Sequence, residues 1–101
     1  TMGKGDDGLG TILMKAFIHT IQDLDDRPDV LIFYNTGVRL AVNGSAVLDD
    51  LKALEEKEVK ILVCGTCLNY FELTGEVAAG IVSNMYDIAG TMSGAGRIVQ
   101  P

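Results

Sequence analysis

The sequence predicts an α/β fold in which a mostly parallel sheet carries helices on both faces, giving three layers. Segments with the helical spacing of apolar residues alternate along the chain with short runs that are apolar throughout, as strands covered on both faces are. The connections are of modest length, and such alternation implies right-handed crossovers and parallel strands. The chain has 101 residues and neither an internal repeat nor a linker, so we expect a single domain over residues 1–101.

The N-terminal half predicts two helices and one strand. Apolar side chains recur every three or four residues over 9–24, and Pro28 ends that helix because the residue before a proline avoids helical geometry. Val30–Tyr34 is predicted to be a strand buried on both faces. Residues 35–37 break it, and a loop or short element is expected over 38–43. Ser45 is predicted to be the N-cap of a second amphipathic helix.

The C-terminal half continues the alternation. We expect a strand over 59–63, a short helix over 68–73, a short strand at 81–82, a helix over 84–92 and a final strand over 97–100. A parallel α/β domain normally begins with a strand, but this sequence begins with a glycine-rich stretch that leads into a helix. We therefore expect an upstream strand that the sequence does not include.

Charge and composition exclude several functions. The net charge of −6 lacks the basic surface that supplies most nucleic-acid affinity, and it is a poor match for an anionic membrane surface. The longest apolar run, Val30–Tyr34, is too short to span a membrane, and the first residues have no apolar segment typical of a secretory signal. Only two cysteines are present, so we expect a reducing, cytoplasmic location.

Residues Gly3–Gly8 match the G-x-G-x-x-G pattern and open a helix. The pattern is typical of a pyrophosphate cradle when a strand precedes it, and here no strand does. Asp6 and Asp7 would also repel phosphate, and no acidic residue ends the strand at Tyr34, where a ribose partner is expected. A turn at the start of a helix is the favoured interpretation, and nucleotide binding remains an alternative.

The motif Cys64-Gly65-Thr66-Cys67 carries the clearest chemical prediction. It lies where a buried strand ends and a helix begins, and this edge of a parallel sheet is where ligands and active sites collect. A thiol at the start of a helix is expected to have a lowered pKa. The pair could carry a persulfide, exchange a disulfide or supply half of a metal site, and it could also be structurally buried and inert.

Other polar residues give weaker predictions. His19, the only histidine, lies beside the apolar stripe of the first helix and is predicted to face solvent. Asn35, Thr36 and Ser83 end strands or precede helices, so they could line the same edge as the cysteines. A structural zinc site usually needs four protein ligands, and this chain offers two cysteines and one histidine, so we predict no metal site.

Four stretches together resemble the DsrE/DsrF-like superfamily, most closely the C-terminal domain of the YedF-type proteins, and the similarity covers nearly the whole chain. They are the N-terminal TMGKGDDGLG, then IFYNTGV after residue 31, ILVCGTCL from residue 61 and VSNMYDI from residue 82. The CGTC and SNMYDI stretches are its most specific parts.

The resemblance implies a Rossmann-like α/β/α fold, homotrimers or homohexamers, and a persulfide carried on a cysteine at the strand end, which matches Cys64. Cys67 is then the additional thiol that resolves or shares the sulfur. No organic cofactor is implied, and the partners would be sulfur donor and acceptor proteins, with a link to selenium metabolism. YedF-type proteins also have an N-terminal TusA-like domain, so we expect this chain to be an isolated second domain. The competing hypothesis is a homo-oligomeric binding module with passive cysteines.

Overall fold

The computed structural model describes residues 1–101 and contains a three-stranded, all-parallel sheet in the order β1-β2-β3. The elements follow each other as α1 (Asp7–Ile21), β1 (Val30–Phe33), the 3-10 helix η1 (Asn35–Ala41), α2 (Leu48–Glu56), β2 (Lys60–Cys64), α3 (Gly65–Tyr70), the 3-10 turn η2 (Thr74–Glu76), β3 (Ile81–Ser83) and α4 (Met85–Gly94). The predicted α/β class with parallel strands is therefore confirmed.

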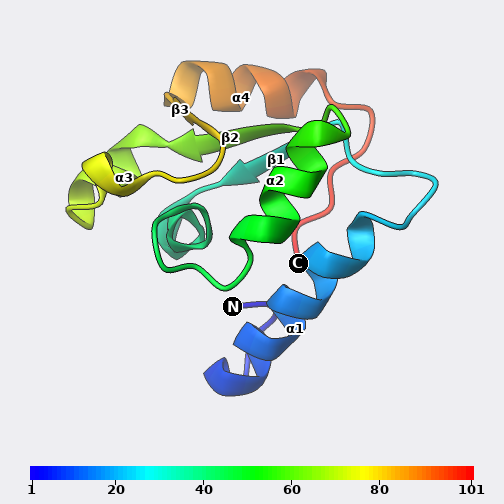
Figure 1. The fold of residues 1–101 in the computed structure, drawn as a ribbon. Helices are drawn as coiled ribbons and strands as arrows, with labels where there is room; N and C mark the ends of the chain where they lie inside the picture. Colours follow the sequence, from blue (N-terminus) through cyan, green and yellow to red (C-terminus); the bar gives the residue numbers. More distant parts are fainter.

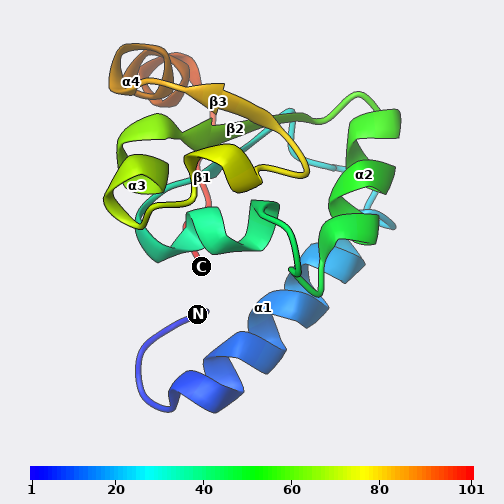
Figure 2. The same cartoon turned by 60° about the vertical axis from the view of Figure 1, so that its left-hand side comes forward.

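Helices cover both faces of the sheet (Figure 1). Helix α4 lies on one face, whereas η1 and α2 lie on the other, and the rotated view in Figure 2 gives the same layers. Strand β2 is central and its Ile61, Leu62 and Val63 are all buried. Burial on both faces explains why the sequence of this strand is apolar without alternation.

The core is concentrated on the face covered by η1 and α2. Val38 of η1 and Leu51 and Leu54 of α2 are fully buried there, whereas Ile88 is the only buried residue of α4. Strand β1 is only half-buried over three of its four residues because it forms an edge of the sheet. The sequence predicted that this strand would be buried on both faces, and that prediction is wrong.

Helix α1 contacts the body of the protein only through its C-terminal half. Ile18 and Ile21 are buried, while Leu9, Ile12 and Leu13 of the predicted apolar stripe are exposed. Figures 1 and 2 both show the N-terminal half of α1 projecting away from the sheet. The helix was expected over 9–24, and it ends instead at Ile21, with Gln22 as its C-cap. None of the helices combines the length and apolarity needed to cross a lipid bilayer.

Two further local predictions are wrong. Ser45 does not cap α2: the N-cap is Val47, and the Ser45 hydroxyl instead accepts the Val47 N–H within a turn, at 3.3 Å. Residues 97–100 do not form a strand, because no strand lies beside them to pair with their backbone. The segment is held through the side chain of Gln100, which donates to the hydroxyl of Tyr34.

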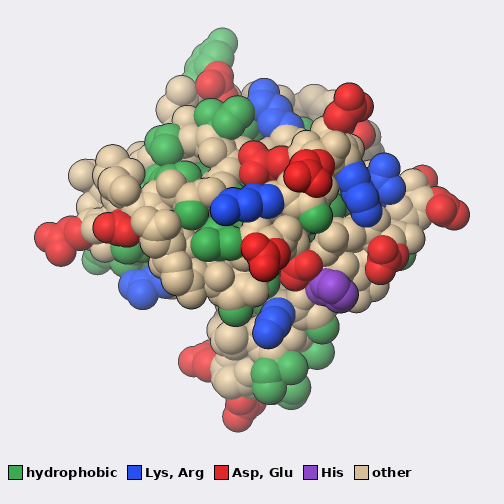
Figure 3. Space-filling model, viewed as in Figure 1, with side chains coloured by type: hydrophobic (Ala, Val, Ile, Leu, Met, Phe, Trp, Pro, Cys, Tyr) green, Lys and Arg blue, Asp and Glu red, His purple; other side chains and the backbone are tan.

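Charges of both signs share the face of the protein that Figure 3 shows. Acidic and basic side chains are interspersed there, with the single histidine among them. This face has no basic patch of the kind that neutralises nucleic-acid phosphates, and the net charge of the chain is −6.

Candidate functional site at the end of strand β2

The two cysteines lie at the junction between β2 and α3, as the sequence predicted. Cys64 is the last residue of β2 and also the N-cap of α3, while Cys67 lies in the first turn of α3. Helix α3 begins at Gly65, directly after the strand and with no loop between them. Both cysteines are free thiols.

The surroundings of the two thiols differ. Cys64 is only 1% exposed and belongs to the hydrophobic core, whereas Cys67 is half-buried and packs at its margin. Of the two cysteines, Cys67 is therefore the one that retains exposed surface in the folded protein. This asymmetry follows from packing, since both residues belong to one short motif.

Asn35 approaches the motif from the end of the neighbouring strand. Its backbone N–H donates a hydrogen bond to Sγ of Cys67, with 3.0 Å between nitrogen and sulfur. Strands β1 and β2 are parallel and in register through Phe33 and Val63, so both strands end at the same edge of the sheet. Asn35 therefore lies beside Cys67, as its place at the end of β1 predicted, and it makes the contact through its backbone.

The pKa of the Cys67 thiol is raised from its ordinary value. Partial burial is the main cause, and interaction with the neighbouring Cys64 thiol adds to it, while the N–H of Asn35 lowers the pKa by a smaller amount. Burial disfavours the charged thiolate, and a donor directed at the sulfur favours it. The sequence-based expectation of a lowered pKa is therefore not met at Cys67, because burial of the thiol outweighs the donor directed at it.

Ser83 and Gly65 adjoin the motif from the other neighbouring strand. The Cα atoms of Ser83 and Cys64 are partners in the β2–β3 register. A Cβ atom placed on Gly65 would lie 3.1 Å from the carbonyl oxygen of Ser83 and 3.3 Å from a methyl of Val82. Glycine at position 65 therefore allows α3 to start close against β3.

Thr36 and Thr66, the remaining predicted lining residues, are less involved. Both are exposed, and their side chains make no hydrogen bond within the protein. Thr36 follows Asn35 on η1, and Thr66 precedes Cys67 on α3. Both therefore border the site, but neither forms a hydrogen bond to a cysteine sulfur.

Two residues beside the site were not predicted. The guanidinium of Arg39 on η1 lies over the ring of Phe71, 4.8 Å from its centroid. Phe71 donates its backbone N–H to the carbonyl of Cys67, at 3.1 Å. The spacing of four residues from Cys67 to Phe71 could have indicated a shared helix face. Arg39 was expected in a loop or short element, and its contact depends on tertiary packing, so that contact could not be predicted.

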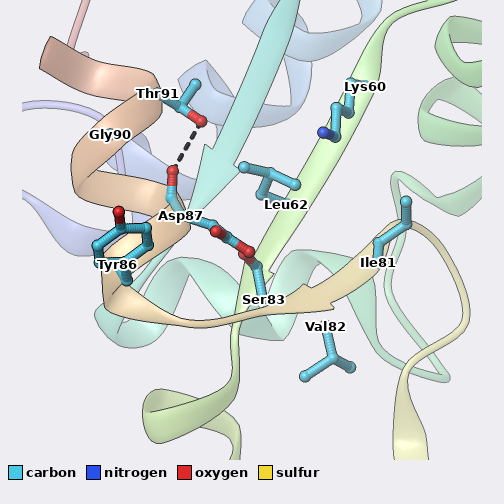
Figure 4. Close-up of a pocket in the computed structure, with 9 residues that line it drawn as sticks. All are labelled: Lys60, Leu62, Ile81, Val82, Ser83, Tyr86, Asp87, Gly90 and Thr91. Atoms are coloured by element: carbon cyan, nitrogen blue, oxygen red, sulfur yellow. Dashed lines mark hydrogen bonds between the residues drawn. The ribbon is translucent and has the colours of Figure 1, made fainter. Parts of the chain in front are cut away.

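A pocket separate from the thiols lies between the edge strand β3 and α4 (Figure 4). It has a volume of about 520 Å³. Ser83 contributes to its wall, and neither cysteine does; the remaining lining includes Lys60, Leu62, Ile81, Val82, Tyr86, Asp87, Gly90 and Thr91. The hydroxyl of Thr91 donates to the backbone carbonyl of Asp87 within this wall, at 2.7 Å.

The glycine-rich stretch leads into α1, and His19 lies on α1. The carboxylate of Asp6 accepts the N–H of Leu9 at 2.8 Å and so caps α1, leaving an acidic group where a phosphate would bind. His19 is 70% exposed through its side chain and contacts Asp50 of α2, which confirms the prediction that it faces solvent. No group of three or more His, Cys, Asp or Glu side chains gathers to hold a metal ion.

A parallel sheet between helices, with two cysteines where its central strand ends, defines a parallel α/β protein with free thiols at the carboxyl edge of the sheet. Among protein families, the model of the DsrE/DsrF-like family matches residues 9–101, nearly the whole chain. This chain belongs to the DsrE/DsrF-like family. No curated protein and no solved structure gives a match.

Proposed function

We propose that this protein is a sulfur-relay protein that carries a persulfide, or its selenium equivalent, on the Cys64–Cys67 motif and passes it to a partner protein. The family to which the chain belongs is associated with sulfur relay. The observation that carries the proposal is the half-buried Cys67 thiol at the carboxyl edge of the sheet, with a second thiol buried directly behind it.

Sulfur is loaded onto Cys67 by exchange between a thiolate and the persulfide of a donor. The Cys67 thiolate attacks the outer sulfur of a donor persulfide, and a new S–S bond forms to Sγ while the S–S bond of the donor breaks. The bonding electron pair leaves on the inner sulfur of the donor, which takes up the proton that Cys67 lost. No external oxidant or reductant is required, and an acceptor thiolate removes the outer sulfur by the same exchange in reverse.

The different burial of the two thiols supports Cys67 as the first acceptor. The family resemblance implies that Cys64 is the carrier, but a thiol that is 1% exposed cannot meet a partner's sulfur without an opening of the core. Cys64 then acts second: its thiolate attacks the outer sulfur of the Cys67 persulfide and holds it away from solvent, while Cys67 leaves as a thiolate. The chemistry requires free thiols and therefore a reducing compartment such as the cytoplasm.

Intact-mass measurement tests the proposal. The reduced protein is mixed with an excess of a persulfide donor such as glutathione persulfide, desalted, and weighed before and after treatment with a reductant. We expect the gain of one sulfur, removed by the reductant, in the wild type and in Cys64→Ser, and no gain in Cys67→Ser. Loading that survives in Cys67→Ser and disappears in Cys64→Ser would overturn the assignment of Cys67. The absence of loading in the wild type would overturn the function.

A second candidate function is a homo-oligomeric binding module in which the cysteines are passive. The observation that favours it is a group of exposed apolar side chains on β3 and at the start of α4, namely Ile81, Val82, Met85 and Tyr86. Exposed apolar patches on soluble proteins commonly mark contacts with other proteins. If neither thiol takes up sulfur and light scattering gives a mass above that of one chain, the binding module becomes the better description.

A further inference from the structure

We propose that Asn35 is a positioning residue for Cys67, in which a left-handed backbone conformation directs the N–H of Asn35 at the Cys67 sulfur and stabilises its reactive anion. This inference rests on the proposed function, because it assigns Asn35 to the thiol that we propose accepts sulfur. Its test measures the ionisation of the thiol and needs no sulfur transfer, so the two proposals can fail separately.

The conformation of the backbone at Asn35 is unusual. Tyr34 is extended, with φ −141° and ψ 167°, and Asn35 then adopts φ 53° before the chain turns into η1. This left-handed region is sparsely populated by residues other than glycine, and asparagine is one of the few that tolerate it. A β-branched residue at position 35 would be strained in this conformation. Relief of that strain would shift the backbone and with it the N–H that points at Cys67.

The hydrogen bond to sulfur joins two segments that are far apart in the sequence. Asn35 and Cys67 are separated by 32 residues, and the nitrogen-to-sulfur distance of 3.0 Å is short for a donor to sulfur. A neutral thiol is a weak acceptor, whereas a thiolate accepts a charge-assisted hydrogen bond that is considerably stronger. The contact therefore favours the thiolate, and it would favour the same charge on Sγ when a persulfide sulfur leaves.

This donor opposes the effect of the packing around it. Burial raises the pKa of the Cys67 thiol and the N–H of Asn35 lowers it. The fraction of reactive thiolate near neutral pH depends on the balance between these two effects. Loss of the hydrogen bond should raise the pKa further, with no change in the residues that contact a donor of sulfur.

Three substitutions separate the hydrogen bond from general strain. Asn35→Gly keeps the left-handed conformation, and Asn35→Val opposes it. Glu58→Val is the matched control, because Glu58 is also exposed, also has a positive φ, 68°, and lies at the end of α2 away from the cysteines. Each variant is first shown to be folded by circular dichroism and urea denaturation.

The measurement is the rate of alkylation of Cys67 by iodoacetamide as a function of pH, resolved from Cys64 by mass spectrometry of fragments. In Asn35→Val we expect a thiolate fraction about tenfold lower at any pH below the pKa, equivalent to a rise of about one pKa unit. Asn35→Gly and Glu58→Val should retain the wild-type profile. An unchanged profile in folded Asn35→Val, or an equal shift in Glu58→Val, would overturn the inference.

A second measurement needs no change at position 35. In the ¹⁵N–¹H correlation spectrum of the wild type, the amide proton of Asn35 should shift with pH at the same midpoint as the alkylation profile. In Cys67→Ser that titration should disappear. An amide of Asn35 that does not respond to pH in the wild type would overturn the inference even if Asn35→Val fails to fold.

Discussion

The Nδ1 atom of His19 on α1 lies 2.9 Å from Oδ1 of Asp50 on α2, and this contact helps to attach the projecting helix to the body of the protein. The hydrogen bond and the charge of Asp50 raise the pKa of His19, with a smaller contribution from Asp23. In turn, the hydrogen bond to His19 lowers the pKa of Asp50, assisted by the amide of Gln22. The pair is therefore a link whose strength depends on pH.

Stability at different pH values tests this link. The pKa of His19 in the folded protein is raised above 6.5. The contribution of His19 to folding stability is therefore complete below pH 6.5 and is lost as pH rises through the folded-state pKa. The contribution of Asp50 is present above its usual 3.8 and is lost as pH falls through its lowered pKa. We expect His19→Gln to lower the free energy of unfolding more at about pH 5.5 than at about pH 8.5. Urea denaturation of the reduced protein measures this, and an equal loss at both pH values would contradict it.

Gly80 should resist substitution by alanine. Its φ is +83°, and a Cβ atom would lie 2.8 Å from a methyl of Ile61 and 3.0 Å from one of Val63. We expect Gly80→Ala to cost about 2–4 kcal/mol, from left-handed strain together with overpacking against β2. Gly44→Ala is the control for strain alone, since Gly44 has φ +87° with open space around it, and should cost about 1–2 kcal/mol. Equal losses of unfolding free energy would rule out the packing argument.

Leu68 should anchor α3 and with it the Cys67 thiol. Leu68 is fully buried, whereas Tyr70 on the same helix is 80% exposed. Leu68→Ala is expected to reduce the free energy of unfolding by about 2–5 kcal/mol through cavity formation, and Tyr70→Ala by about 0.5 kcal/mol or less. Chemical denaturation of both variants makes the comparison, and a large loss in Tyr70→Ala would show that the exposed ring has a structural role.

The capping residues of α4 and α2 should contribute unequally. The side chain of Asn84 accepts the N–H of Asp87 at 2.9 Å as a true N-cap, whereas Ser45 only accepts a turn N–H ahead of α2. We expect Asn84→Ala to cost about 1 kcal/mol. Ser45→Ala should lower the free energy of unfolding by less. Thermal unfolding of the two variants measures the difference, and equal losses of stability would contradict the prediction.

The two thiols should react with alkylating reagents in sequence. Cys67 is half-buried and Cys64 is buried, so an alkylating reagent should modify Cys67 in the native protein and Cys64 only in urea. Because burial raises the pKa of Cys67, its alkylation at neutral pH should be slower than that of an unfolded cysteine peptide and should accelerate as pH rises. Rapid modification of Cys64 in native protein would show that the core opens readily at this point.

Much of the fold and part of the site could be predicted because the deciding information is local. The apolar run of β2, the cysteines at its end and the helix introduced by Asn84 each depend on residues within a few positions of one another. The alternation of helices and strands then indicates parallel strands, and parallel strands bring their carboxyl ends to one edge. This is why Asn35 and Ser83 could be expected beside the motif.

Tertiary structure alone decided the remaining features, because each depends on which distant segments pack together. The apolar stripe of α1 has the spacing of a buried face, yet its N-terminal half meets no packing partner and stays exposed. Residues 97–100 have the composition of a strand, but a strand forms only beside another backbone. Likewise, Cys64 and Cys67 share one short motif, but their surroundings differ. The surrounding core buries the Cys64 thiol, whereas the N–H of Asn35, 32 residues away, contacts the Cys67 thiol.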